Sequence, residues 1–144
     1  MADIGDAKKI PLPVDISISA DDALLWVNTW NDGMTRAFDI KDPFHPKEIF
    51  SEKIGAQVNM LSESWDGKRL YYTSSLLANW DKTEAPPGED LQYFKAYAWD
   101  GRKLAHKFTI DFFKEQLGRP HQMNFGAYAL YAQRRPADTL TAGR

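Results

Sequence analysis

Hydrophobic and polar positions alternate over short stretches of this chain. Residues 14–19 (VDISIS) and 103–110 alternate or nearly so, as strands of an antiparallel sheet do when one face meets solvent. Residues 24–30 (LLWVNTW) and 70–76 (LYYTSSL) are rich in apolar and aromatic side chains on both faces, which is typical of inner strands. The pattern therefore predicts an all-β fold made of short strands.

Turn sequences divide these strands. Glycine follows aspartate at positions 32–33, 66–67 and 100–101, each time between segments rich in β-branched and aromatic residues. Both residues of an Asp-Gly pair tolerate a positive φ, so this pair is the strongest short-range signal for a β-hairpin. Three hairpins are therefore predicted.

Two segments depart from the strand pattern. Residues 77–91 carry Pro86-Pro87-Gly88 and several charges, which indicates an irregular surface insertion. In residues 110–118 (IDFFKEQLG), Asp111 can cap a short helix and Gly118 stands where a left-handed residue ends one. Phe112, Phe113 and Leu117 supply the stripe of that predicted helix, which we expect to serve packing.

The chain also repeats itself. A shift of 45 residues aligns Ser19 with Ser64 and Asp21 with Asp66, and the pattern Ser-x-Asp-x-x-x-Leu-aromatic occurs twice. A period of about 40–45 residues with four strands in each unit is typical of β-propeller blades. The sequence thus predicts a partial propeller of about two four-stranded blades and the start of a third. Its expected parts are a blade at 13–54, a blade at 57–110 with the insertion at 77–91, a short helix at 111–117 and a terminal strand at 120–131.

Two blades cannot close a ring. Repeat architectures need at least about three units to cover their stacked faces. Apolar blade faces would therefore stay exposed, which marks interaction surfaces. We expect either self-association or partner blades that lie outside this chain.

Composition narrows the function classes. A formal net charge of −2 leaves no basic field for a nucleic acid, and we expect no nucleic-acid partner. No segment approaches the run of about 20 apolar residues that spans a membrane, so no membrane partner is expected. The chain contains no cysteine, which excludes disulfides, thiolate metal ligands and cysteine-bound selenium.

Four runs of residues, PLPVDISISADDALLWVNTWNDG, FDIKDPFHPK, SWDGKRLYYTSSLLANWDK and LGRPHQMNF, resemble the C-terminal portion of the selenium-binding protein family. This family includes the copper-dependent methanethiol oxidases. The resemblance implies a piece of a seven-bladed propeller and a small thiol substrate. The implied reaction is oxidation of methanethiol by oxygen and water to formaldehyde, hydrogen sulfide and hydrogen peroxide. Family proteins are much longer, so the resemblance implies a C-terminal fragment that is inactive alone. Periplasmic and cytoplasmic locations both remain open.

Copper accepts imidazole readily, so candidate ligands are sought among the three histidines. His45 lies in the bend KDPFHPK between the third and fourth strands of the first blade, where a structural or idle role is expected. His106 lies on an outer strand and is expected to be solvated. His121 looks like a family histidine, which makes it the candidate copper ligand. The alternative is that His121 only hydrogen-bonds the backbone at a strand start.

One histidine does not make a copper site. Met123 would share a strand face with His121 and could offer a thioether, although core packing is its more common role. The remaining ligands must come from blades outside this chain or from a partner chain. Two interpretations therefore remain: a section of a copper-dependent thiol oxidase, and a noncatalytic propeller segment that acts as a binding or assembly module.

Overall fold

The computed structural model describes residues 10–123 and has eight strands there, with no helix among the described residues. The strands are β1 (Pro13–Ile18), β2 (Leu24–Thr29), β3 (Met34–Asp39), β4 (Lys47–Lys53), β5 (Leu61–Glu63), β6 (Arg69–Thr73), β7 (Tyr93–Trp99) and β8 (Leu104–Asp111). The described part of the chain therefore offers no helical membrane span.

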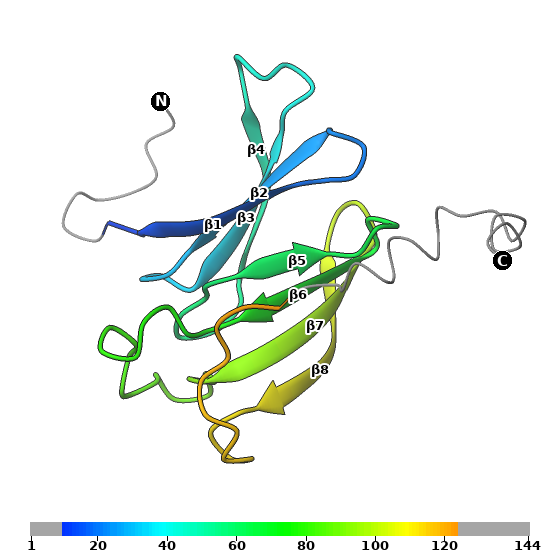
Figure 1. The fold of residues 1–144 in the computed structure, drawn as a ribbon. Helices are drawn as coiled ribbons and strands as arrows, with labels where there is room; N and C mark the ends of the chain where they lie inside the picture. The colour runs from blue at the N-terminus through cyan, green and yellow to red at the C-terminus, as the bar shows by residue number, and fades with distance from the viewer. Residues whose placement is uncertain (1–9, 124–144) are drawn as a thin grey trace, which may run out of the picture.

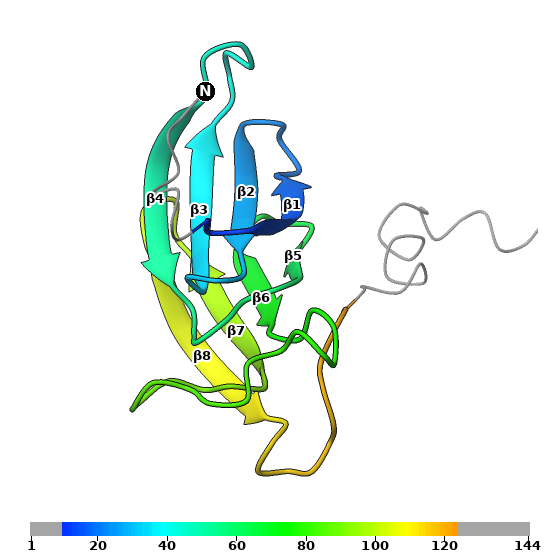
Figure 2. The same ribbon diagram turned by 90° about the vertical axis from the view of Figure 1, so that its left-hand side faces the viewer.

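The strands form two antiparallel sheets of four strands each, in the orders β1-β2-β3-β4 and β5-β6-β7-β8. Figure 1 shows the two sheets as neighbouring layers, and Figure 2 shows that both sheets meander in sequence order from β1 and β5 outward. This arrangement confirms the predicted all-β fold of two four-stranded units. Each predicted Asp-Gly turn joins two neighbouring antiparallel strands.

The repeated sequence pattern builds the same turn twice, between β1 and β2 and between β5 and β6. In the first copy, the Ser19 hydroxyl donates to Asp21 at 2.6 Å and accepts from the Leu24 N–H at 2.9 Å. In the second copy, the Ser64 hydroxyl donates to Asp66 at 2.5 Å and accepts from the N–H five residues further on at 3.0 Å. The repeat is therefore explained by the hydrogen bonding of the turn.

We expect Ser19→Ala and Ser64→Ala to destabilise the chain by similar amounts, about 1 kcal/mol each. Both serines are buried and each hydroxyl makes two hydrogen bonds. Urea unfolding followed by circular dichroism measures the two losses, with Ser51→Ala at an exposed position of β4 as the control. A large difference between the two buried variants would contradict the equivalence of the turns.

The core lies between the two sheets and is largely aromatic. Trp26 of β2 is fully buried, and its ring lies 5.0 Å from that of Trp99 in β7, edge to face at 82°. Phe50 of β4 completes the cluster at 5.0 Å from Trp99 and 6.1 Å from Trp26. Edge-to-face pairs of this kind favour a fixed arrangement of rings. This cluster attaches the first sheet to the second.

Each sheet has a second face that no described element covers. In β1, Ile16 and Ile18 are 64% and 55% exposed, and in β8, Phe108 and Ile110 are 48% and 39% exposed. Tyr71 is the residue 45 positions after Trp26, and it stacks on Phe94, which in turn packs on Phe108. Trp26 thus faces the shared core, whereas its repeat partner lies on the outer face of the second sheet. Stacked blades have this relation, because each blade turns the same face toward the next one.

The predicted helix at 111–117 is wrong. Residues 112–116 form turns, although Asp111 does accept hydrogen bonds from the N–H groups of Phe113 and Lys114, both at 3.0 Å. Gln116 has a φ of 54°, which a helix does not admit, and Gly118 has a φ of 86°. Phe113 and Leu117 are 75% and 57% exposed and only Phe112 is half-buried, so most of the apolar stripe packs against no described surface.

The predicted terminal strand at 120–131 falls only partly on described residues. Residues 120–123 are not part of a strand, and the remainder lies outside the described range.

Candidate metal site at the inner strands

His121 lies where the chain leaves the second sheet. The N–H of Ser75, just after β6, donates to the carbonyl of Pro120 at 2.9 Å. The hydroxyl of Thr73 donates to the carbonyl of His121 at 2.7 Å. Two hydrogen bonds from the end of β6 therefore fix the backbone on both sides of the imidazole.

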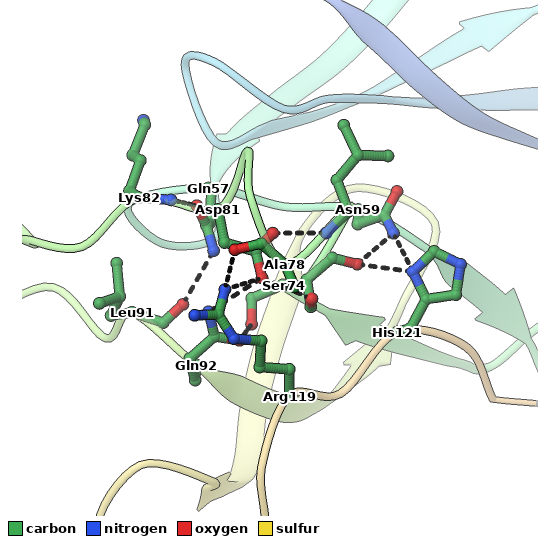
Figure 3. Close-up of polar contacts among 12 residues, drawn as sticks. Gln57, Asn59, Ser74, Ala78, Asp81, Lys82, Leu91, Gln92, Arg119 and His121 are labelled. Atoms are coloured by element: carbon green, nitrogen blue, oxygen red, sulfur yellow. Dashed lines mark hydrogen bonds and ion pairs between the residues drawn. The ribbon is translucent and has the colours of Figure 1, made fainter.

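The shortest contact of the His121 ring favours one tautomer. Its Nδ1 lies 2.9 Å from the carbonyl oxygen of Ser75, and a carbonyl can only accept, so Nδ1 carries the hydrogen. The Asn59 amide nitrogen lies 3.2 Å from the same Nδ1 and donates to the same carbonyl (Figure 3). If Nδ1 accepted from Asn59 instead, it would face the Ser75 carbonyl without a hydrogen, so the shorter contact to Ser75 favours the hydrogen on Nδ1. The carbonyl oxygen has two lone pairs and can accept from both His121 and Asn59. Nε2 is then unprotonated, with its lone pair free to bind.

This arrangement fits a metal ligand. Metal-ligating histidines almost always donate their second ring N–H to a carbonyl or carboxylate, which fixes the orientation of the ring. His121 does this through Ser75 while its side chain stays exposed. Among the described residues, no group of three or more histidine, aspartate or glutamate side chains could hold a metal ion. The described part of the chain therefore holds no complete metal site of this kind.

The other two histidines lie elsewhere. The ring of His45 is exposed in the bend between β3 and β4, with Nδ1 2.8 Å from Asp42. His106 is exposed on β8, with Nε2 2.8 Å from the Thr109 hydroxyl and its ring 5.3 Å from that of Tyr97. Each thus has a local partner on its own element or on the neighbouring strand. Met123, the predicted thioether candidate, is half-buried two residues beyond His121.

Asn59 and His121 occupy equivalent positions at the starts of successive blades. The Asn28 side chain donates to the carbonyl of Asn59 at 2.7 Å, and Thr73, which is 45 residues after Asn28, donates to the carbonyl of His121. The two side chains are also in contact with each other. A propeller places equivalent residues of successive blades around one axis. Asn59 and His121 would therefore lie at the same radius from the axis of a ring that further blades would complete.

A buried carboxylate lies behind the histidine. The side chain of Asp81 is fully buried, and it pairs with Arg119 at 2.9 Å. It also accepts from the Ser75 hydroxyl at 2.5 Å, from the Leu76 N–H at 2.8 Å and from the Gln92 amide at 3.3 Å. Burial alone would raise the pKa of Asp81, but these hydrogen bonds outweigh it and hold the pKa below its ordinary value.

Sequence reasoning missed Asp81. It lies in the segment 77–91, which was predicted to be an irregular surface insertion. The segment is irregular, and Trp80 beside Asp81 is 56% exposed, but the carboxylate turns inward. Nothing in the local pattern distinguishes Asp81 from the other charged residues of the segment.

Two neighbouring four-stranded meanders define a segment of a β-propeller. The chain belongs to the 56 kDa selenium-binding protein family, whose model matches residues 3–127. It is 57% identical over 132 residues to a methanethiol oxidase of Ruegeria pomeroyi, covering 92% of this chain and 30% of the relative. It is 60% identical over 124 residues to a methanethiol oxidase of a Hyphomicrobium species, covering 86% of this chain and 28% of the relative.

A solved structure supports the same family. The chain resembles a hypothetical selenium-binding protein from Sulfolobus tokodaii with a TM-score of 0.60 and 29% identity, covering 71% of this chain and 26% of that one. A lower-identity likeness to a 6-phosphogluconolactonase-like protein from Bacteroides fragilis, at 17% identity and a TM-score of 0.53 over 71% of this chain and 26% of that one, shows the fold alone. The chain thus spans about 30% of the length of the curated relatives it matches.

Proposed function

We propose that this chain is the C-terminal section of a methanethiol oxidase, to which it contributes His121 as one ligand of a copper site. Methanethiol is the small thiol substrate, and one molecule each of methanethiol, oxygen and water gives one each of formaldehyde, hydrogen sulfide and hydrogen peroxide. Two relatives at 57% and 60% identity carry the name methanethiol oxidase. The observation that carries the proposal for His121 is the hydrogen bond from Nδ1 to the Ser75 carbonyl, which leaves Nε2 free.

The chain's own residues prepare the imidazole. Bound copper would supply the electron-transfer chemistry between the thiol and oxygen. Nε2 of His121 would hold it, because imidazole nitrogen suits copper and the chain has no thiolate. Thr73 and Ser75 keep the histidine backbone in place, and the Asn59 side chain contacts the imidazole at Nδ1. The remaining ligands would come from blades outside this chain.

The experiment replaces the matching section of the Hyphomicrobium enzyme with this chain and measures copper content and methanethiol-dependent peroxide in the resulting chimera. The chimera is expected to bind copper and produce peroxide. His121→Gln should lower the apparent copper affinity by about 100-fold or more, since removing a ligand costs at least as much as removing its supporting partner. His106→Gln, the same change on exposed β8, should have no effect. Full copper loading in the His121→Gln chimera would overturn the proposal.

The chain by itself is expected to bind Cu(II) weakly and to produce no peroxide from methanethiol, because its described residues hold a single imidazole donor at this position. Isothermal titration with Cu(II) and a peroxide assay on the purified chain measure both. Tight one-to-one copper binding by the monomer would show that the ligands are not divided between this chain and other blades.

The exposed outer faces favour a second, noncatalytic function as an assembly module. Ile16 and Ile18 on one face and Phe108 and Ile110 on the other are apolar and 39–64% exposed. Exposed apolar patches of this kind mark interaction surfaces. Concentration-dependent oligomerisation of the purified chain without copper, together with an inactive chimera, would support the assembly function over the oxidase.

A further inference from the structure

The buried carboxylate and the histidine are joined through one peptide group. The Asp81 carboxylate accepts from the Leu76 N–H at 2.8 Å through Oδ1. The Ser75 carbonyl, which accepts from His121 Nδ1 at 2.9 Å, belongs to the same peptide group as that N–H. A trans peptide is planar, and its N–H and C=O point in opposite directions. An acceptor that fixes the N–H on one side therefore fixes the direction of the carbonyl on the other.

The second oxygen of the same carboxylate holds the histidine's own segment. Asp81 Oδ2 accepts from Arg119 at 2.9 Å, two residues before His121. Arg119 also donates to the carbonyl of Ala78 at 2.8 Å, so the guanidinium bridges the loop and the outgoing chain. Asp81 Oδ2 accepts from the Ser75 hydroxyl as well, at 2.5 Å. The Asp81 side chain thus holds both the Ser75 residue whose carbonyl accepts from the imidazole and the backbone segment that carries His121.

We propose that Asp81 is a positioning residue for His121: its carboxylate, the peptide group of residues 75 and 76, and the imidazole form a relay that keeps the ring hydrogen on Nδ1 and leaves Nε2 free. The relay rests on the proposed function only for the statement that Nε2 binds copper. The tautomer itself can be measured on the chain without any metal.

The energetics favour this role over simple packing. A buried carboxylate without partners is strongly destabilising, so Asp81 needs the donors that surround it. Those donors come from the end of β6, from Gln92 just before β7 and from Arg119 in the outgoing segment. Hydrogen bonds in a low-dielectric interior also polarise one another along a chain. The carboxylate therefore strengthens the Ser75 carbonyl as an acceptor as well as orienting it.

The test is nitrogen NMR of the 15N-labelled full chain, free of metal, at a pH where the histidines are neutral. His121→Gln assigns the ring signals. In the unaltered chain the Nδ1–H form of His121 should dominate. Asp81→Ala should lower the ratio of the Nδ1–H form to the Nε2–H form by about fivefold, the shift that follows from losing one ordinary hydrogen bond. An unchanged ratio in folded Asp81→Ala would overturn the proposal.

The matched control is Asp66→Ala. Asp66 also accepts from a serine hydroxyl and from a backbone N–H, but it lies in the turn between β5 and β6, away from the contacts around His121. Asp66→Ala should destabilise the chain and leave the tautomer ratio of His121 unchanged. A shift in this control equal to that of Asp81→Ala would assign the effect to general loosening and overturn the relay.

A second variant keeps the test decisive where Asp81→Ala does not fold. Arg119→Gln removes one attachment of the outgoing segment at a half-exposed side chain, and it should shift the tautomer ratio in the same direction by a smaller factor. No shift in Arg119→Gln would then count against the relay. If the tautomer ratio shifts as expected in Asp81→Ala or Arg119→Gln but the His121→Gln chimera still binds copper fully, the relay is kept and the copper ligand is rejected. If the His121→Gln chimera loses copper but neither Asp81→Ala nor Arg119→Gln shifts the tautomer ratio, the copper ligand is kept and the relay is rejected.

Discussion

Trp26→Ala is expected to destabilise the chain by about 3–5 kcal/mol, the range for deleting a buried aromatic side chain. Trp26 is fully buried between the two sheets, with Trp99 of β7 at 5.0 Å and Phe50 of β4 at 6.1 Å. Alanine would leave a cavity at the contact that holds the sheets together. Urea unfolding, followed by tryptophan fluorescence and circular dichroism, measures the loss.

The matched control is Trp65→Ala in the turn between β5 and β6, where the side chain is 47% exposed. This change should cost about 0.5 kcal/mol or less, as surface substitutions usually do. Equal losses for Trp26→Ala and Trp65→Ala would contradict a core centred on the contact between the sheets.

Gly33→Ala should cost more than about 4 kcal/mol or prevent folding, a size reserved for severe steric or core defects. Gly33 has a φ of 66° in the turn between β2 and β3, and an added Cβ would lie 1.9 Å from the carbonyl oxygen of Gly55. The position of a Cβ is set by the backbone, so no rotamer relieves this contact. The Ile54 N–H also donates to the carbonyl of Gly33 at 2.8 Å, which holds the two backbones together. Thermal unfolding and soluble yield measure the effect.

Gly88→Ala is the control for Gly33→Ala, because it introduces the strain of a positive φ without a steric contact. Gly88 has a φ of 83°, and nothing lies within 4 Å of an added Cβ. Its substitution should cost about 1–2 kcal/mol, the strain of a left-handed conformation for a residue with a side chain. Similar losses at Gly33 and Gly88 would show that the close approach of Gly33 to Gly55 does not exist.

The fold was predictable where local chemistry decides it. The pairs at 32–33, 66–67 and 100–101 place glycines with φ values of 66°, 66° and 92° in the turns, although the aspartates do not share the positive φ that a type I′ turn needs. The repeat of Ser19 and Asp21 at Ser64 and Asp66 was predictable for the same reason, since its hydrogen bonds join residues at most five positions apart. Short-range signals therefore predicted both sheets.

The same signals failed at residues 111–117, because capping and a terminal glycine specify a turn as well as a helix. Asp111 does accept the expected hydrogen bonds, yet no described surface covers Phe113, and most helical stability comes from tertiary packing. A correct local signal gave the wrong element for lack of a packing partner.

The surroundings of His121 depend on residues far away in the sequence. Ser75 and Asn59 lie 46 and 62 positions from it, and Asp81 lies 38 positions from Arg119. No periodicity or spacing rule connects such residues, so the tautomer of His121 and the inward turn of Asp81 required the structure. The family resemblance selected His121 and said nothing of its partners.

The most direct test of the copper ligand counts the nitrogen nuclei bound to Cu(II) in the chimera of this chain with the Hyphomicrobium enzyme. Electron paramagnetic resonance of the chimera, of its His121→Gln variant and of its His106→Gln variant provides the count. His121→Gln should show one coordinated nitrogen fewer than the chimera, and His106→Gln the same number as the chimera. An equal count in all three would contradict the assignment of His121 to the copper site.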